Sequence, residues 1–380
     1  MERYTINPRG DWQAKVEELG LVYHSLDGRY WDESACYEFT AAEVDMLEAA
    51  TNGLHRLCVE AVGRVISQNL FARLHIPSDF VPLIRQSWER EDLSLYGRFD
   101  LCYDGSRAPK LYEYNADTPT SLLEAAVVQW HWLEEVFPGA DQFNSIHEKL
   151  IAAWTGAKLR GPVHFACVRD HAEDLANTVY LEDTARQAGL ETRRLFMDEI
   201  AWNGLNFLDA QNERIGTLFK LYPWEWLLDE QFSVHLLQEP WQVVEPAWKM
   251  ILSNKAILPL LWEWYPEHPN LLAAYTSPER LGSSFVKKPI FGREGANVTM
   301  IDNGNQLTTD GDYGAEGYVY QALAMPRLFS NNYPVIGSWV VQGEAAGMGI
   351  RESDSPITRN TSRFVPHYFA ASEEAELTDI

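Results

Sequence analysis

Cysteine is scarce in this chain. The four that occur show no Cys-x-x-Cys spacing, which removes the usual signature of structural zinc sites and of dithiol redox motifs. The chain opens with the charged residues Met1, Glu2 and Arg3 rather than with a secretory signal pattern. We therefore expect a cytoplasmic protein with free thiols. The cysteines are Cys36, Cys58, Cys102 and Cys167.

Basic residues and long apolar runs are scarce too. The chain has 31 Lys and Arg against 55 Asp and Glu, which gives a formal net charge of -24. Such a chain is repelled by nucleic acids and anionic membranes, and it attracts cations such as polyamines. No apolar run approaches the roughly 20 residues that a membrane helix needs. We expect small-molecule partners, no nucleic acid and no membrane, and the pattern leaves the oligomeric state open.

Apolar and aromatic residues, by contrast, are plentiful. They make up 46% and 12% of the 380 residues, which is typical of a globular protein with a large core and excludes a disordered chain. Segments with helical and strand periodicity both occur along the chain. The composition and length predict a mixed α/β (α+β) protein of two or three subdomains.

Two familiar phosphate-binding motifs are absent, the Walker A sequence and a Gly-x-Gly-x-x-Gly turn after a strand. Other segments carry similar chemistry. Lys255 stands alone at the edge of a strongly apolar stretch and, once partly buried, needs an anion. A predicted strand containing Lys288 leads into a loop with Gly292 and Gly295. Small residues in such a loop allow the backbone to approach phosphate groups.

A predicted hairpin is the most informative segment. The runs 95–103 and 110–116 are rich in aromatic and apolar residues, and Asp104-Gly105 between them is a turn signal. Side chains alternate between the two faces of a strand. One face of the hairpin is therefore expected to be polar, and the other is expected to pack against the core.

The polar face of this hairpin would carry Arg98, Asp100, Glu113 and Asn115. Two carboxylates and an amide oxygen are hard ligands of the kind that hold Mg²⁺ through nucleotide phosphates. The neighbouring arginine would meet charge that develops on a transferred phosphoryl group. On spacing alone, an ordinary half-exposed hairpin with a surface salt bridge remains the alternative.

Two helices flank the hairpin in the sequence. Thr40 and Glu43 form a capping-box pattern before an amphipathic stretch that continues to about Ala72. A second helix is predicted over 122–137, where a Pro-Gly pair ends it. The segment 117–121 before this helix is rich in hydroxyl groups. These hydroxyls either cap the helix or contact a polar substrate, and we expect at least one of them to be a cap.

A compact strand-helix-strand unit is predicted next, with strands at 164–168 and 192–196 and a helix that ends near Gln187. Ligands of open α/β sheets gather beyond the carboxyl ends of the strands. Glu173 and Asp174 occupy that place, where they would bind an amine. The alternative is that they satisfy the dipole of the helix that they begin.

Three further segments complete the pattern. The cluster 222–226 is predicted to be a packed aromatic core with one carboxylate. The segment 317–322 is predicted to be a strand that ends at Gln321. The segment 338–349 is predicted to be one more strand, interrupted by glycines and ending at Arg351.

The order of the motifs RFD, YEYNAD, NKAILP and KPIFGREG, followed by a strand ending in Gln, resembles the synthetase domain of the glutathionylspermidine synthase family. The resemblance runs from about Tyr96 to about Phe369, and we include the N-terminal helices. It implies an ATP-grasp fold with a pre-ATP-grasp-like α/β subdomain. The implied parts, interleaved in one unit, are a helical scaffold with the metal-binding hairpin (1–160), a substrate-binding subdomain (161–245) and a nucleotide-binding region (246–380).

This resemblance also implies an ATP-dependent ligase, with ATP as co-substrate and Mg²⁺ as cofactor. In such a ligase a peptide carboxylate becomes an acyl phosphate, which an amine then attacks. Arg98 would be the catalytic residue that stabilises the transferred phosphoryl group. The implied metal ligands are Asp100, Glu113 and Asn115; the implied ATP-binding residues are Arg98, Lys255, Lys288, Gly295, Gln321 and Arg351; and the implied substrate-binding residues are Thr118, Thr120, Glu173 and Asp174.

The chain departs from the family pattern in three ways. It has no room for the amidase domain of bifunctional members, so amide hydrolysis is not expected. Thr118 and Thr120 replace serines, and the acidic pair of the amine site is also changed, which leaves both glutathione and spermidine open as substrates. Arg359 and Arg363 follow where an aspartate near the polyamine is expected. We expect these arginines to repel a cationic amine.

Two other functions are open at this point. One is an altered homologue that binds ATP or a peptide without turnover, against which the intact arginine, acids and lysines of the motifs argue. The other is a carbohydrate-processing enzyme that uses some of the 14 tryptophans as stacking platforms and a pair of acids for catalysis. That function leaves both lysine motifs unexplained.

Overall fold

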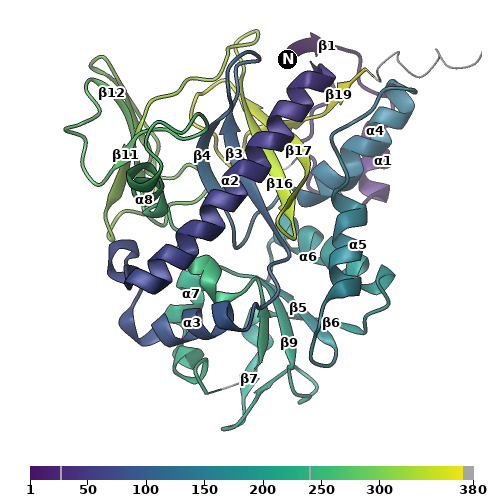
Figure 1. Cartoon of the computed structure of the whole chain (residues 1–380). Coiled ribbons are helices and arrows are strands. Elements are labelled where there is room, and N and C mark those ends of the chain that lie inside the picture. The colour runs from purple at the N-terminus through teal and green to yellow at the C-terminus, as the bar shows by residue number, and fades with distance from the viewer. Residues whose placement is uncertain (26–27, 239–240, 371–380) are drawn as a thin grey trace, which may run out of the picture.

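The computed structural model describes residues 1–25, 28–238 and 241–370. Figure 1 shows a central sheet with strands β3, β4, β16 and β17, a second sheet with β11 and β12 beside it, and a third with β5, β6 and β9 below. The α-helices are α1 (Trp12–Glu18), α2 (Ala41–Gln68), α3 (Val81–Glu89), α4 (Gln129–Val136), α5 (Ile146–Gly156), α6 (Ala172–Gln187), α7 (Trp224–Asp229) and α8 (Ile257–Trp264).

The central sheet is antiparallel and has the strand order β18-β17-β16-β3-β4. Its strands are β3 (Tyr96–Cys102), β4 (Lys110–Asn115), β16 (Tyr333–Val341), β17 (Glu344–Ser353) and β18 (Arg363–Val365). Strands β3 and β4 form the predicted hairpin, in which Arg98 lies opposite Asn115 and Asp100 lies opposite Glu113. The hairpin prediction is confirmed, and the register brings the four polar residues together on the two strands at the β4 edge of the sheet.

The prediction of a single strand ending at Arg351 is wrong. The region forms two antiparallel strands, β16 and β17, joined by a tight turn at Gln342 and Gly343. Both turn residues have positive φ, 47° and 86°, which is the geometry that a two-residue hairpin loop requires. Glutamine is not a residue typical of such turns, so the reversal has only a weak signal in the sequence.

Helix α2 crosses the central sheet along its length (Figure 1). Its predicted capping box is confirmed, because the Thr40 hydroxyl accepts from the Glu43 N–H at 3.3 Å and the Glu43 carboxylate accepts from the Thr40 N–H at 2.9 Å. The helix ends at Gln68, earlier than predicted. Asn69 adopts a left-handed conformation, and a short 3₁₀ helix, Phe71–Leu74, follows.

The other two large sheets lie on different sides of the central one. One is antiparallel, in the order β11-β15-β12-β13-β14, and the other is parallel, in the order β10-β9-β5-β6. The strands of the antiparallel sheet are β11 (Ala274–Tyr275), β12 (Ser284–Pro289), β13 (Thr299–Asp302), β14 (Asn305–Thr308) and β15 (Tyr318–Ala322). The strands of the parallel sheet are β5 (Val163–Cys167), β6 (Thr192–Phe196), β9 (Thr217–Leu221) and β10 (Gln242–Val244).

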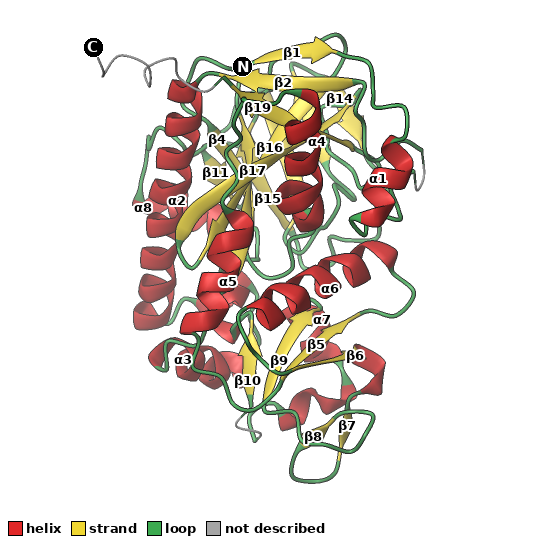
Figure 2. Cartoon of the chain, turned by 90° about the vertical axis from the view of Figure 1, so that its right-hand side faces the viewer, coloured by secondary structure: helices red, strands yellow, loops and turns green. Residues whose placement is uncertain are grey.

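The predicted strand-helix-strand unit is confirmed as β5, α6 and β6. Figure 2 shows α6 lying across this parallel sheet at the lower end of the molecule. A small ribbon of β7 (Ala201–Trp202) and β8 (Phe207–Leu208) extends beyond it. The start of α6 therefore lies at the carboxyl end of β5, where the acidic pair was expected to meet a ligand.

The helix after the hairpin differs from the prediction at its start. Helical structure begins at Leu122 and includes a π-helical stretch, Glu124–Val128, before α4. No hydroxyl of 117–121 caps it, so that prediction is wrong. The Leu122 N–H instead donates to the side-chain oxygen of Asn177, which lies on α6, at 3.0 Å. A distant amide has taken the role that a neighbouring hydroxyl usually fills.

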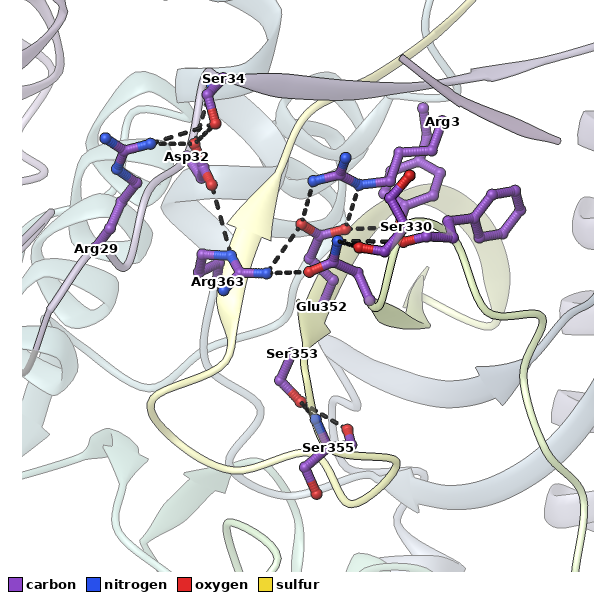
Figure 3. Close-up of polar contacts among 12 residues, drawn as sticks. Arg3, Arg29, Asp32, Ser34, Ser330, Glu352, Ser353, Ser355 and Arg363 are labelled. Atoms are coloured by element: carbon purple, nitrogen blue, oxygen red, sulfur yellow. Dashed lines mark hydrogen bonds and ion pairs between the residues drawn. The ribbon is translucent and has the colours of Figure 1, made fainter. Parts of the chain in front are cut away.

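The N-terminal strand is tied to the central sheet by an ionic network around Glu352 (Figure 3). A small sheet of β1 (Glu2–Thr5), β2 (Ala35–Phe39) and β19 (His367–Phe369) packs there. The buried Glu352 carboxylate accepts two hydrogen bonds from Arg3, both at 2.8 Å, and one from Tyr37 at 2.6 Å. Arg363 lies 3.2 Å from the same carboxylate and 3.5 Å from Asp32.

Two predictions about composition can be checked directly. Cys36, Cys58, Cys102 and Cys167 are buried free thiols, as predicted. Within the described ranges, every helix is too short or too polar to cross a membrane.

Candidate active site

The polar face of the β3–β4 hairpin forms the centre of the candidate site. Arg98 is buried and contacts both oxygens of Asp100, at 2.7 Å from Nε to Oδ1 and 3.1 Å from Nη2 to Oδ2. The Asn115 amide donates to Asp100 at 3.2 Å and to Glu113 at 3.4 Å. The four residues that the strand pattern placed on one face therefore lie in mutual contact.

Two lysines approach this face from other elements. Lys255, just before α8, lies 2.8 Å from Glu113 Oε2 and donates to the Gly292 carbonyl at 2.6 Å. Lys288, on β12, donates to the Gln321 side-chain oxygen at 2.7 Å. The anion that Lys255 was expected to need is thus Glu113. Gln321 lies on β15, the strand next to β12, and orients the second lysine.

Burial and charge shift the pKa values of these groups in opposite directions. Burial by itself would raise the pKa of Glu113, but the charges of Lys255 and Lys288 outweigh it and lower that pKa below its usual value. Burial lowers the pKa of Lys288 to about 8, against the attraction of Glu113. The cleft therefore holds an ionised carboxylate beside two lysines, an arrangement that suits a metal-bound polyphosphate.

Two cavities meet at this cluster. The first, of about 110 Å³, lies between β4, β12 and β15, and we call it the sheet cavity; its lining includes Tyr112, Lys255, Lys288 and Gln321. The second, of about 230 Å³, is bounded by the hairpin, the start of α6 and several loops, and we call it the loop cavity; its lining includes Arg98, Asn115, Thr118, Thr120 and Arg351. Asp100, Glu113, Gly295 and Thr358 line both cavities.

Gly295 closes the boundary between the two cavities. Its φ of 69° is left-handed, and a Cβ there would lie 2.2 Å from the Thr358 carbonyl oxygen. Both facts require glycine. The loop after β12 thus rests against the loop after β17, so that both loops contribute to both cavities.

Arg351, on β17, lines the loop cavity beside Arg98. Its guanidinium donates to the Arg359 carbonyl, while its buried Nε has no hydrogen-bond partner within the described part of the chain. An unpaired buried donor of this kind is suited to an anionic ligand. The position is compatible with the phosphate-side role that the resemblance implied.

The predicted threonines also line the loop cavity. The Thr118 hydroxyl accepts from Arg293 at 2.8 Å, and Arg293 is also held by Glu225 of α7 at 3.1 Å. The Thr120 carbonyl accepts from Arg98 at 2.6 Å. The threonine segment is therefore tied to the hairpin arginine and to the loop after β12.

The acidic pair lies at the start of a helix, and one of its two residues also lines a cavity. Glu173 and Asp174 lie in the first turn of α6, where they complement the helix dipole. Asp174 also lines the loop cavity with His171, whereas Glu173 is buried behind it with 8% of its surface exposed. Only Asp174 of the pair is in direct reach of a ligand in this cavity.

The aromatic cluster 222–226 is only partly a packed core. Trp224 is 1% exposed, as predicted, and Lys220 lies 4.5 Å from its ring centre. Trp226 is 40% exposed and lines the loop cavity, so the prediction is wrong for this residue. The Arg293 guanidinium stands 5.9 Å from the Trp226 ring centre.

The family model for the glutathionylspermidine synthase pre-ATP-grasp region matches residues 3–370, which is nearly the whole chain. The chain belongs to the glutathionylspermidine synthase family. The suspected resemblance is thus confirmed, and membership extends through the N-terminal helices.

Named relatives of this glutathionylspermidine synthase family member are ligases and synthetases. A candidate acid–amine ligase of Haemophilus influenzae is 43% identical over 97% of this chain and 100% of its own length. Trypanothione synthetase of Crithidia fasciculata is 31% identical over 93% of this chain and 57% of its own length. Bifunctional glutathionylspermidine synthetase/amidase of Escherichia coli is 28% identical over 94% of this chain and 63% of its own length. The predicted enzyme class, a ligase, is confirmed.

The fold also has a known counterpart. A glutathione synthetase-like effector from Globodera pallida, solved without ligand, superimposes with a TM-score of 0.58 over 94% of this chain and 96% of that chain, at 9% identity. An identity this low supports the fold alone. The predicted mixed α/β ATP-grasp fold is confirmed, while the three-part division at residues 160 and 245 stays a prediction.

A family of ATP-grasp ligases raises the question whether Mg²⁺ fits this site. Asp100 and Glu113 present hard oxygen donors at the junction of the cavities, and Asn115 lies between them. Asn115 turns its amide nitrogen toward both acids, and rotation of the amide would present its oxygen instead. Arg98 and Lys255 now supply the positive charge beside the acids. The donor set fits Mg²⁺.

Sequence reasoning missed several residues of the candidate site. Arg293 and Glu225 are 68 positions apart, and no spacing signal joins them. Glu294 lines the loop cavity, where burial and then Glu173 raise its pKa. Arg363 is paired with Asp32 and Glu352 in the network of Figure 3, so its charge is offset there, and the expected repulsion of a cationic amine by Arg359 and Arg363 stays a prediction.

Proposed function

We propose that this chain is an ATP-dependent carbon–nitrogen ligase that joins a peptide carboxylate to an amine through an acyl phosphate. ATP is the co-substrate and Mg²⁺ the cofactor. The sheet cavity takes the nucleotide, with Lys255, Lys288 and Gln321 around it. The loop cavity takes the peptide and the amine.

One observation carries this proposal: the two cavities share Asp100 and Glu113. A phosphoryl group can pass from a nucleotide to a carboxylate only if both reactants reach one point in line. The shared acids are that point, and Arg98 stands beside them on the side of the loop cavity. A binding protein for a single ligand does not need two chambers joined at a charged cluster.

The chemistry follows from positions and charges. Arg98 and Arg351 face the carboxylate and the transferred phosphoryl group, and they offset the negative charge that develops there. Mg²⁺ held by Asp100, Glu113 and Asn115 would neutralise the nucleotide phosphates. Lys255 and Lys288 orient those phosphates from the other side. Positioning and charge supply the catalysis, and no covalent nucleophile is required.

The substrates are proposed by class. A glutathione-like peptide would lie along Thr118 and Thr120, and a polyamine-like amine would approach Asp174. The named relatives make glutathionylspermidine and trypanothione, which motivates glutathione and spermidine as the first pair to try. The net charge of -24 favours the approach of a cationic amine.

The test is Mg²⁺-dependent phosphate release from ATP, measured with glutathione and spermidine separately and together, and then with other peptides and amines. Release that needs both an acid and an amine, with an amide of matching mass, is the expected result. Tight ATP binding without release for any pair would favour the alternative, a homologue that has lost turnover. Saccharide cleavage without ATP would instead support the carbohydrate-processing function.

A further inference from the structure

Glu124 is a buried carboxylate that the proposed roles leave unused. It has no exposed surface and begins the π-helical stretch Glu124–Val128. One of its oxygens, Oε1, accepts from Tyr30 at 2.6 Å and from Tyr23 at 3.0 Å. The other, Oε2, has no hydrogen-bond partner among the described residues. An ionisable group is seldom buried in this way without a function, and π-helical turns often mark functional sites.

A chain of hydrogen bonds leads from this carboxylate to the catalytic cluster. The Tyr30 hydroxyl lies 3.0 Å from the Ser121 hydroxyl. Because the Tyr30 proton is already donated to Glu124, the Ser121 hydroxyl donates to Tyr30. The lone pairs of Ser121 are then free to accept a proton, and Ser121 lines a small cavity together with Arg98, Asp100 and Arg351.

The charges around this chain favour movement of a proton toward Glu124. Arg98 and Arg351 lie beside Ser121, at the end of the chain that meets the small cavity, so they repel an added positive charge there. At the far end, burial first and then the charge of Glu173, on α6, raise the pKa of Glu124 to about 7. A carboxylate with that pKa accepts a proton near neutral pH and later gives it back.

We propose that Ser121, Tyr30 and Glu124 form a proton relay that deprotonates the attacking amine of the ligase reaction. The inference rests on the function proposed above. The ammonium passes one proton to Ser121, whose own proton moves to Tyr30, and the Tyr30 proton moves to Glu124. The neutral amine forms the C–N bond as the C–O bond of the acyl phosphate breaks. The departing phosphate takes the second proton, and Glu124 returns the first to solvent after product release.

The choice of the amine that attacks the acyl phosphate allows the relay to be tested separately from the earlier steps of the reaction. Hydroxylamine is largely unprotonated at neutral pH, whereas an alkylamine with a pKa of about 10 is almost entirely an ammonium ion. Both attack the same acyl phosphate. The experiment compares ATP-dependent hydroxamate formation with amide formation for the full-length protein, using glutathione and then other peptides as the acid, and hydroxylamine or spermidine as the acceptor.

Glu124→Gln and Tyr30→Phe are the test variants, because both keep the shape of the buried chain. Each is expected to slow amide formation by about 10²- to 10⁴-fold and to leave hydroxamate formation within about threefold of wild type. Tyr37→Phe is the matched control, since Tyr37 also donates to a buried carboxylate at 2.6 Å, that of Glu352, and neither residue lines the sheet cavity, the loop cavity or the small cavity at Ser121. It should change neither product by more than about twofold.

The dependence of the rate on pH is a second test, because a purely structural role of Glu124 would leave that dependence unchanged. Wild-type amide formation should fall as the pH drops through about 7, because Glu124 becomes protonated there and can no longer accept a proton. This fall should exceed the one caused by protonation of the amine substrate. Glu124→Gln should lack that extra step, and Glu124→Asp should restore part of the rate. The groups that face Glu124 from other elements are Glu173, Tyr23 and Tyr30.

Three outcomes would overturn the relay. Equal loss of hydroxamate and amide in the variants would mean that these residues support an earlier step or the fold. Unchanged amide formation in Glu124→Gln and Tyr30→Phe would mean that the proton leaves by another route. Absence of hydroxamate from wild type with every peptide would overturn the ligase itself, and the relay with it. If Glu124→Gln does not fold, Tyr30→Phe and Ser121→Ala carry the same comparison.

Discussion

At the residue scale, each acid of the hairpin is paired with a cation. Asp100 has Arg98, and Glu113 has Lys255. An unpaired buried charge costs several kcal/mol, so this pairing lets the charged cluster persist before any ligand arrives. In the proposed reaction, Asp100 and Glu113 would hold Mg²⁺ and Lys255 and Lys288 would face the nucleotide phosphates, so each charged group would change its partner. Such an exchange of partners leaves little charge uncompensated at any stage.

The Arg98→Ala variant tests whether Arg98 acts on the transferred phosphoryl group and not on nucleotide binding. Arg98 lines the loop cavity and does not line the sheet cavity, so nucleotide affinity should change by less than about threefold, while phosphate release falls by roughly 10³-fold or more. Calorimetric titration with a non-hydrolysable nucleotide and a phosphate assay measure the two effects. Arg169→Ala is the control, since this exposed arginine pairs with Asp198 and Glu199 instead. A loss of nucleotide binding equal to the loss of turnover would contradict the assignment.

At the scale of single elements, local signals were reliable wherever they involved neighbouring residues. The capping box at Thr40, the turn at Asp104-Gly105 and the alternation along β3 were all read correctly from the sequence, because each depends on atoms a few residues apart. The turn at Gln342 was missed, since a residue atypical of turns occupies it. The cap of Leu122 was missed because its acceptor is on another helix.

Thr40→Ala should weaken α2 by removing half of the capping box. The expected loss is about 1 kcal/mol of unfolding free energy, because the Glu43 N–H loses its side-chain acceptor and keeps the Thr40 backbone carbonyl at 3.1 Å. Urea denaturation followed by circular dichroism measures it. Thr155→Ala is a suitable comparison, since this exposed threonine bonds only to the Ile151 carbonyl of its own helix and should change stability by less than about 0.5 kcal/mol. Equal effects in the two variants would argue against the cap.

At the scale of the whole molecule, distant segments are joined through buried polar contacts. His367, on β19, is fully buried and bonds to Gln129 of α4 at 3.0 Å, across 238 positions of sequence. Its Nε2 has no partner in the described part of the structure. Burial lowers its pKa from 6.5 to about 3, because a proton on Nε2 would have no acceptor.

Acid should therefore destabilise the whole fold through His367. The folded pKa lies below the unfolded value, so between pH 6.5 and 3 the unfolded chain binds the extra proton, and the contribution of His367 to stability is lost as pH falls. We expect this contribution to decline by up to about 1.4 kcal/mol per pH unit. Denaturant unfolding of wild type and His367→Gln at several pH values measures it. His131→Gln, at a half-exposed site on α4, should keep the wild-type slope.

The sequence by itself determined several of the elements and most of the chemistry they carry. The hairpin face, the capped helix, the strand-helix-strand unit and the order of motifs are local or collinear features, and spacing of 2 or about 3.6 residues fixes them. The predicted lysines and acids did converge. Their catalytic and binding roles stay predictions, since the geometry only brings them together.

Tertiary structure alone decided which distant groups meet. Arg293 lies against Glu225, Lys288 against Gln321, and Tyr30 against Glu124, at separations of 68, 33 and 94 residues. No periodic signal reaches across such distances, because the contacts depend on how whole sheets and helices pack. The joining of two cavities at Asp100 and Glu113, and the proton path behind them, exist only in the folded molecule.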